Sequence, residues 1–430
     1  METIKKKLDN LTIILISFLP FALAAGPAVV EIVSLIIIIN FFLLKKKFYF
    51  ESKEIYIFLF YLITIISSIF SEHKLHSFQS SFFLIRIILL YYIFKNYFRF
   101  DSEKIINLTY IILSITLSIL IFDVLFQYLF KFSLFGTSSQ AENRLNMHFR
   151  DEAIIGGYFS KILPVYIFIC FSKLKDISQK LNLINILIII LSVICTLLSN
   201  ERSAAFFLIG FLFMIVFFSN IKNLKKFISL LLLGITVFSF LFTVPSLKSR
   251  FINETIEEFT GQNDSHIDIT KRESVNKNSN ENTISFIERK RDSKFFMFST
   301  AHEAHIMTAI NIFKHKYWLG AGPNNFRNFC SEDKYGIYAE RGCSTHPHHI
   351  LSQVLSELGI GGLFFYILIF FYIMRKLLIQ FIYRELNYNY IFIFCFYLLL
   401  ISPIMPAGNL FNNWYLYSIS LPFLYLKFCK

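Results

Sequence analysis

The sequence has few cysteines and few charged residues for its length. Six cysteines are scattered over 430 residues, and no two form a Cys-x-x-Cys pair, which argues against zinc and iron–sulfur sites. Charged residues make up 17% of the chain and hydrophobic residues 55%. Because soluble proteins do not have such a composition, we expect an integral membrane protein.

The formal net charge of +13 could indicate a nucleic-acid-binding protein. The lysines argue otherwise, because they lie between long apolar runs rather than in one basic patch. We therefore expect no nucleic-acid partner, and we expect the protein to be surrounded by membrane lipid.

Apolar runs long enough to cross a bilayer, which takes roughly 20 residues, recur along the chain. They lie near residues 11–27, 28–44, 55–70, 78–94, 105–130, 154–171, 183–199, 203–219, 227–244, 353–373, 388–405 and 409–426. The first two runs are nearly fused, and Gly26-Pro27 is the only turn signal between them. The predicted fold is an all-α polytopic membrane protein with about 12 transmembrane helices. It divides into an N-terminal transmembrane region at 1–244, a large, partly helical periplasmic loop at 245–352, and a C-terminal transmembrane region at 353–430.

Basic residues gather in alternate connections, for example at 45–47 and 222–226. By the positive-inside rule these connections and both termini are cytoplasmic, which places the loop at 245–352 on the periplasmic side of a bacterial inner membrane. The N-terminus also resembles a signal peptide, with Lys5–Lys7, an apolar core and Ala22-Leu23-Ala24. Charge alone leaves cleavage after this segment open.

The large loop has two parts of different composition. Residues 261–294 are polar with very few large apolar residues, which predicts a flexible stretch. Residues 295–352 are expected to be structured. There, Ile306, Ile310, Phe313 and Tyr317 recur at helical spacing, which predicts an amphipathic helix.

Three patterns in the loop have alternative explanations. His302-Glu303-Ala304-His305 is one residue short of the His-Glu-x-x-His zinc motif, so no metal site is expected. Gly320-x-Gly322 does not follow a strand, which argues against a dinucleotide site. Cys330 and Cys343 share an oxidising compartment and can form a disulfide, or remain two unpaired small side chains.

Three histidines, His346, His348 and His349, surround Pro347 just before an apolar run. Pro347 suits the first turn of a helix, with Thr345 or His346 as its cap. The positive end of the helix dipole would then keep the histidines neutral and able to accept a proton. The alternative is a set of polar surface histidines at a membrane interface.

Four predicted spans each carry one ionisable residue, and all four residues fall in the outer part of the membrane. They are Glu31, Arg86, Asp123 and Lys161. Since buried charge is costly, this common level predicts a polar cavity open to the outside, although Arg86 and Asp123 could instead form a structural ion pair. The absence of similar residues in the inner half argues against an ion path across the membrane.

Two arginines lie in short outer connections. Arg202 belongs to the tight hairpin Asn200–Ser203, and Arg144 lies in the preceding outer loop. Guanidinium groups match phosphate oxygens and stay charged at any working pH. An outward pocket with several arginines and neutral histidines suits a lipid diphosphate.

At these residues the chain resembles the superfamily of O-antigen ligases and O-antigen polymerases. His346-Pro347-His348-His349 is followed by nine residues, Gly359, two residues and Gly362. The family pattern has a His, an amide or Ser, nine residues and Gly, so His348 matches the key histidine and His349 departs at the next position. The turn Gly320–Phe326 resembles a turn that precedes this histidine in the family.

Arg202 and Arg144 resemble two arginines that bind the donor in this superfamily. The family often has a further arginine upstream of the loop helix, where this chain has Ala301-His302-Glu303.

The resemblance implies transfer of a glycan from an undecaprenyl-diphosphate carrier to an acceptor, which is lipid A–core or another glycan. It implies an inverting reaction without metal or cofactor. The expected catalytic residues are His348 and Arg202. The expected substrate-binding residues are Arg144, His346, His349, Arg86 and Lys161.

Two alternatives remain open on the sequence. An O-antigen polymerase joins repeat units to each other, and no residue separates it from a ligase. A flippase for lipid-linked sugars is the other alternative. It is disfavoured because the sequence lacks paired Gly/Pro-broken segments and its buried charges are not at the midplane.

Overall fold

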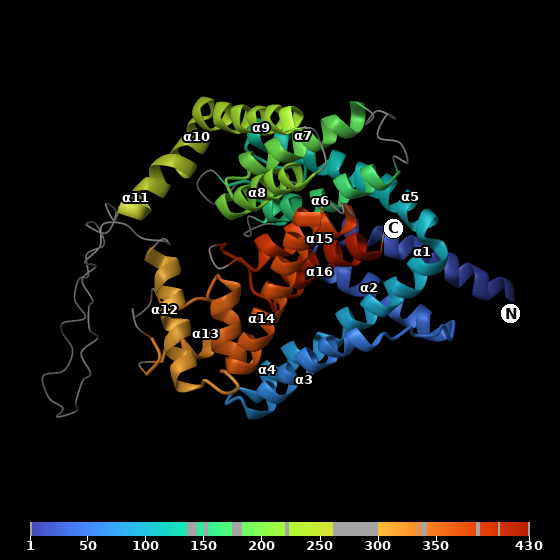
Figure 1. Ribbon diagram of the computed structural model, residues 1–430, viewed down its shortest axis with the longest axis vertical. Helices are drawn as coiled ribbons and strands as arrows, with labels where there is room; N and C mark the ends of the chain where they lie inside the picture. Colours follow the sequence, from blue (N-terminus) through green and yellow to red (C-terminus); the bar gives the residue numbers. More distant parts are fainter. Residues whose placement is uncertain are drawn as a thin grey trace, which may run out of the picture.

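The computed structural model describes residues 2–135, 144–149, 154–173, 183–219, 223–260, 300–332, 334–336, 342–383, 388–402 and 405–428. The regular secondary-structure elements within these ranges are all helices (Figure 1). The predicted flexible stretch at 261–294 lies outside the described residues.

The helices have the following bounds. They are α1 Glu2–Ala25, α2 Pro27–Leu43, η1 Ser52–Glu54, α3 Ile55–Phe70, α4 Lys74–Phe83, α5 Ile85–Phe130, η2 Met147–Phe149, α6 Ile155–Lys173, α7 Leu183–Leu198, α8 Arg202–Phe218, α9 Asn223–Thr243, α10 Pro245–Lys248, η3 Ser249–Asn253, α11 Glu254–Thr260, α12 Thr300–His315, α13 Phe326–Phe329, α14 Ile350–Tyr383, α15 Tyr388–Leu400 and α16 Asn413–Phe428.

Among the described residues, 4 helices are long and apolar enough to cross a membrane, or up to 5 if a helix pair bent by 100° at Val244 counts as one span. The four are α1, α4 with α5, α6 and α14. Shorter apolar helices of 10–17 residues lie at α2, α3, α7, α8 and in α15. The predicted class of helical membrane protein is confirmed, whereas the count of about 12 spans stays a prediction.

One predicted helix break, between α1 and α2, is present, and another, at residues 95–104, is not. Gly26 (φ 125°) separates α1 from α2, and Pro27 occupies the first turn of α2, as the sequence predicts. The predicted connection between 78–94 and 105–130 is instead part of α5, which is 46 residues long and leaves helical geometry only at Asp101. Residues 95–104 contain no Gly or Pro, so no helix-breaking residue ends the helix there.

One side of α1 is buried against α2, α5 and α16. Its Pro20 has no N–H, which leaves the carbonyl of Ile16 without a helical donor. The Tyr425 hydroxyl of α16 donates to that carbonyl. Tyr158 of α6 donates to the Pro20 carbonyl (2.8 Å), and Trp414 Nε1 donates to the Leu23 carbonyl (3.1 Å). Side chains of other helices thus satisfy backbone groups that cannot bind water inside a membrane.

α14 is broken at Gly359, whose φ of 62° and ψ of −149° are accessible only to glycine. A Cβ there would lie 2.7 Å from the Gly320 nitrogen and from the Trp318 carbonyl. A Cβ on Gly320 (φ 71°) would lie 2.3 Å from the Glu357 carbonyl carbon. Two glycines therefore allow the turn after α12 to touch the backbone of α14.

Three backbone hydrogen bonds join this turn to α14. Ile360 donates to Tyr317 (2.7 Å), Ala321 donates to Ser356 (2.8 Å), and Gly322 donates to Glu357 (3.0 Å). These bonds replace the intrahelical bonds lost at the break. Figure 1 shows α12 and α13 beside the first half of α14, with α3 and α4 next to it.

We expect Gly359→Ala to destabilise the protein by about 1–3 kcal/mol from backbone strain, with a further loss from the clash at 2.7 Å. The measurement is thermal unfolding of the purified protein in detergent. Gly361→Ala is the matched control, because a Cβ at Gly361 meets Ile63 at an ordinary 3.5 Å. Equal melting temperatures for the two variants would contradict the role assigned to the break.

Candidate active site

Serines of α3 and α4 hold the turn after α12 from one side. Ser67 donates to the Leu319 carbonyl (2.6 Å), Ser71 to Ala321 (2.6 Å), and Ser77 to Pro323 (3.2 Å). In addition, Asn325 Nδ2 donates to Ser71 Oγ (2.8 Å). The turn at Gly320–Phe326, which resembles a turn of the family, is therefore held by the α3 and α4 region on one side and by α14 on the other.

A buried polar network links the turn to α14 and to the segment before α16. Glu357 accepts from the Phe326 N–H (3.0 Å) and from Gln353 Nε2 (2.9 Å). Gln353 Nε2 also donates to Asn409 Oδ1 (2.7 Å), and Asn409 Nδ2 donates to Asn324 Oδ1 (2.8 Å). Because unsatisfied buried polar groups are costly, this network specifies one arrangement of the three segments.

The histidine segment enters α14 later than the sequence predicts. α14 begins at Ile350, so Pro347 lies before the helix rather than in its first turn. His349 takes the cap position, because its carbonyl accepts from Gln353 N (2.9 Å) and its Nδ1 accepts from Ser352 N (3.3 Å). The prediction of Thr345 or His346 as the cap was wrong, and His349 has a structural role at this helix end.

His348 is held by the segment that precedes α16. Its backbone is left-handed (φ 54°), and its carbonyl accepts a hydrogen bond from the Ala407 N–H (2.8 Å). The Ala407 carbonyl lies 3.2 Å from His346 Nε2. This tertiary contact stabilises a conformation unfavourable for a helical residue, and so it delays the start of α14.

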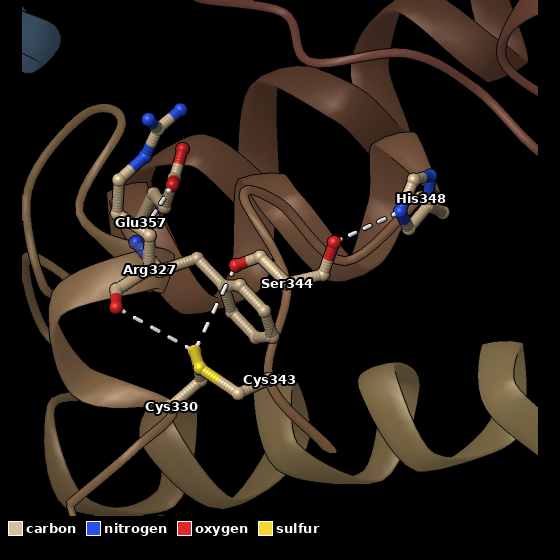
Figure 2. The surroundings of a disulfide bond; sticks show 7 residues. Arg327, Cys330, Cys343, Ser344, His348 and Glu357 are labelled. Carbon is tan, nitrogen blue, oxygen red and sulfur yellow. Dashed lines mark hydrogen bonds between the residues drawn. A yellow bond between two sulfur atoms is a disulfide. The ribbon is translucent and has the colours of Figure 1, made fainter. Parts of the chain in front are cut away.

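A disulfide between Cys330 and Cys343 lies beside this segment, which confirms the paired alternative (Figure 2). Cys330 is buried with Phe326 and Phe329. Ser344, the next residue after Cys343, lies with its Oγ 3.1 Å from His348 Nε2. The disulfide thus fixes the chain next to Ser344, whose hydroxyl contacts the His348 ring.

The predicted amphipathic helix is present as α12, but a different face is buried. Its buried residues are Ala304, Thr308, Ala309 and Ile312 rather than the predicted apolar stripe. Small residues are required there because the chain at 342 approaches closely: a Cβ on Gly342 would lie 2.5 Å from Thr308 Oγ1. This rotation turns the histidines of α12 towards His348.

Four histidine rings form a cluster, defined as His302, His305, His346 and His348. The His348 ring centroid lies 4.0 Å from that of His346, 5.2 Å from that of His305 and 5.6 Å from that of His302. Burial lowers the pKa of His348. Burial, with neighbouring His348, lowers the pKa of His302 and His305 to about 4 and of His346 to about 3. The lowered pKa values favour the neutral form of all four rings near pH 7, as the sequence predicts for His348, although burial rather than the helix dipole is the main cause.

Arg202 is an arginine whose charge acts on the histidine cluster. Arg202 begins α8, and its Nη1 donates to Thr255 Oγ1 of α11 (3.0 Å). Its positive charge contributes, after burial and His348, to the lowered pKa of His302. Arg144 is half-buried, and the charges of Arg250 and Arg202 act on it. The charge of Arg202 therefore acts both on His302 and on Arg144, which belong to separate segments of the chain.

Lys161 and Glu201 are two ionisable residues whose charges act on each other, and the charge of Arg144 also acts on Glu201. Glu201 accepts from the Gly156 and Gly157 N–H groups (2.6 and 3.0 Å) and so satisfies the N-terminus of α6. A Cβ on Gly156 would lie 2.3 Å from Ser199 Oγ, which is why glycine is needed. Lys161 is buried, with Nζ 5.4 Å from the Tyr415 ring centroid. The expected role of Lys161 in substrate binding stays a prediction.

Arg86 has a structural set of partners. Its Nη2 lies 2.9 Å from Glu31 Oε1 and donates to Asn413 Oδ1 (2.6 Å). Asp123 instead accepts from the Leu134 N–H (2.7 Å). The alternative of an Arg86–Asp123 ion pair was therefore wrong, because Arg86 pairs with Glu31 instead. Substrate binding by Arg86 stays a prediction.

Four residues near the site were not predicted as site residues from the sequence. Ser344 makes a hydrogen-bond contact with the His348 ring. The signal available in the sequence was that Ser344 lies only four residues before His348. His302 and His305 drew attention only as an incomplete metal motif. Arg250, in the π-helical turn η3, pairs with Glu254 and lies near Arg144; no sequence pattern marked it.

This arrangement defines a polytopic helical membrane protein with a histidine–arginine site built on a broken helix. Residues 187–367 match the family model described as O-antigen ligase. This region includes Arg202, His348 and the break at Gly359, and its match supports the O-antigen ligase superfamily. No curated protein and no solved structure gave a match.

We expect Ser344→Ala to lower kcat/KM about 3- to 10-fold, because one hydrogen bond that orients His348 is worth roughly 0.5–1.5 kcal/mol. The rate of glycan transfer by the purified enzyme is the measurement. Ser344→Thr keeps the hydroxyl and should retain most activity. Unchanged kinetics in Ser344→Ala would show that the hydroxyl does not orient the ring.

Proposed function

We propose that the protein is an O-antigen ligase that moves a glycan from undecaprenyl diphosphate to a sugar of lipid A–core. The observation that carries the proposal is His348, held by Ser344 and Ala407, in a cluster with His302, on which the charge of Arg202 acts. A proton acceptor and a cation at one place match the two needs of glycosyl transfer from a diphosphate.

We further propose a topology of about 12 spans with both termini in the cytoplasm and residues 245–352 in the periplasm. The bias of basic residues towards alternate connections supports this orientation. The Cys330–Cys343 disulfide supports it independently, because disulfides persist in the periplasm and not in the cytoplasm.

The proposed reaction is a single displacement at the anomeric carbon. The acceptor hydroxyl oxygen forms the new bond, its proton passes to His348, and the bond to the diphosphate oxygen breaks. Arg202 and Arg144 offset the charge that develops on the departing undecaprenyl diphosphate. Attack from the face opposite the leaving group inverts the anomeric centre. Each step uses side chains of this chain and requires no metal ion.

We expect His348→Ala to lower transfer about 10²- to 10⁴-fold through loss of the proton acceptor. Arg202→Ala should lower it about 10²- to 10³-fold through loss of charge stabilisation. The measurement is surface polysaccharide in a deletion strain that expresses each variant at equal level. Arg375→Ala, at an exposed position of α14, is the control and should behave as wild type.

The deletion strain itself separates the two enzyme classes of this superfamily. Accumulated lipid-linked polymer supports a ligase, whereas core capped with a single repeat supports a polymerase and overturns the proposed acceptor. Normal surface polysaccharide in both His348→Ala and Arg202→Ala would overturn the proposed chemistry as a whole.

We expect the acid midpoint of the kcat/KM profile to lie below the ordinary histidine pKa of about 6.5. The reason is that burial lowers the pKa of His348, so the ring keeps its neutral, proton-accepting form to a lower pH. A pH–rate profile of the purified enzyme tests this. A midpoint at or above 6.5 would contradict the assignment of His348.

A further inference from the structure

Two histidines of α12 lie close to His348, the proposed proton acceptor. His302 and His305 are three residues apart and so share one face of the helix. Both ring centroids lie within 5.6 Å of that of His348. His305 Nδ1 is buried and has no hydrogen-bond partner among the described residues. Since a buried nitrogen without a partner is costly, this atom points to a ligand that would satisfy it.

Charge divides the site into two regions. Arg202 and Arg144 carry fixed positive charge, which suits the diphosphate of the donor. The histidine cluster consists of rings that are half-buried or buried, and their lowered pKa values favour the neutral form near pH 7. A neutral imidazole offers one N–H donor, one nitrogen acceptor and an apolar ring face. Such a set suits an uncharged group with many hydroxyls, which is a sugar ring, better than it suits a phosphate.

We propose that His302 and His305 form the acceptor subsite, where they hydrogen-bond hydroxyls of the acceptor sugar and position it beside His348. This inference rests on the proposed function and deepens it, because it assigns the acceptor to α12 and the donor to the arginines. α12 is fixed for this purpose, since Ala309 and Ile312 pack with Cys330 of the disulfide.

A bound metal ion is the other occupant that histidines suggest. Among the described residues no group of three His, Cys, Asp or Glu side chains could hold a metal ion. A sugar needs only two suitably placed polar groups here, and it also uses the ring faces. The observations therefore favour the sugar, and metal binding becomes an outcome of the test.

The test is steady-state kinetics of the purified enzyme in detergent with His302→Leu and His305→Leu. The donor is undecaprenyl-diphosphate-linked glycan, and the acceptor is lipid A–core, both extracted from the deletion strain. We expect KM for the acceptor to rise roughly fivefold or more, because hydrogen bonds to the sugar are lost. KM for the donor should not change, and kcat should fall by no more than about threefold. His305→Asn, which keeps polar atoms, should recover part of the loss.

His315→Leu is the matched control, because His315 is an exposed histidine of the same helix and lies about 20 Å along it from His302. An unchanged acceptor KM in both His302→Leu and His305→Leu, with an active wild type, overturns the acceptor subsite alone. A donor KM that rises instead also overturns it. Loss of wild-type activity in a chelator, with recovery in Zn²⁺, would assign the histidines to a metal. No transfer by the wild type would overturn the proposed function rather than this inference.

Discussion

The close backbone contact between Gly320 and Gly359 is the constraint on which the site depends. It requires two residues without a Cβ, and it interrupts α14 inside an apolar segment. In return, three backbone hydrogen bonds satisfy the groups exposed by the break. A membrane interior supplies no water for such groups, so the turn after α12 must occupy this position whenever the helix is broken. The direction of α12 and of the histidine segment follows from that contact.

Hydrogen bonds between distant segments then set the chemistry. Ala407, Asn409 and Gln353 tie the segment before α16 to the start of α14, and His348 takes a left-handed conformation because Ala407 holds its carbonyl. On the other side, the disulfide fixes Ser344 against the ring. Burial keeps the histidines neutral, whereas the arginines remain charged. The site therefore combines a proton acceptor with cations that do not compete for the same proton.

The success of sequence reasoning depended on whether the cause was local. Gly26-Pro27 breaks the helix as predicted, because both residues act on their own backbone. The stretch at 95–104 does not break it, since charge marks polarity along the chain but does not disrupt helical hydrogen bonds. The start of α14 was predicted too early, because the hydrogen bond from Ala407 comes from a remote segment. The face of α12 was predicted wrongly because the close approach of Gly342 favours small residues over large apolar ones.

The sequence by itself determined the class of protein, the superfamily motif around His348 and Gly359, and the arginine in the tight hairpin. Each of these depends on composition or on residues close together in the chain. Only the tertiary structure decided that Arg86 pairs with Glu31, that Ser344 orients His348, and that His302 and His305 face the same site. These contacts join separate elements, and their choice depends on which side chains satisfy each other once the helices are packed.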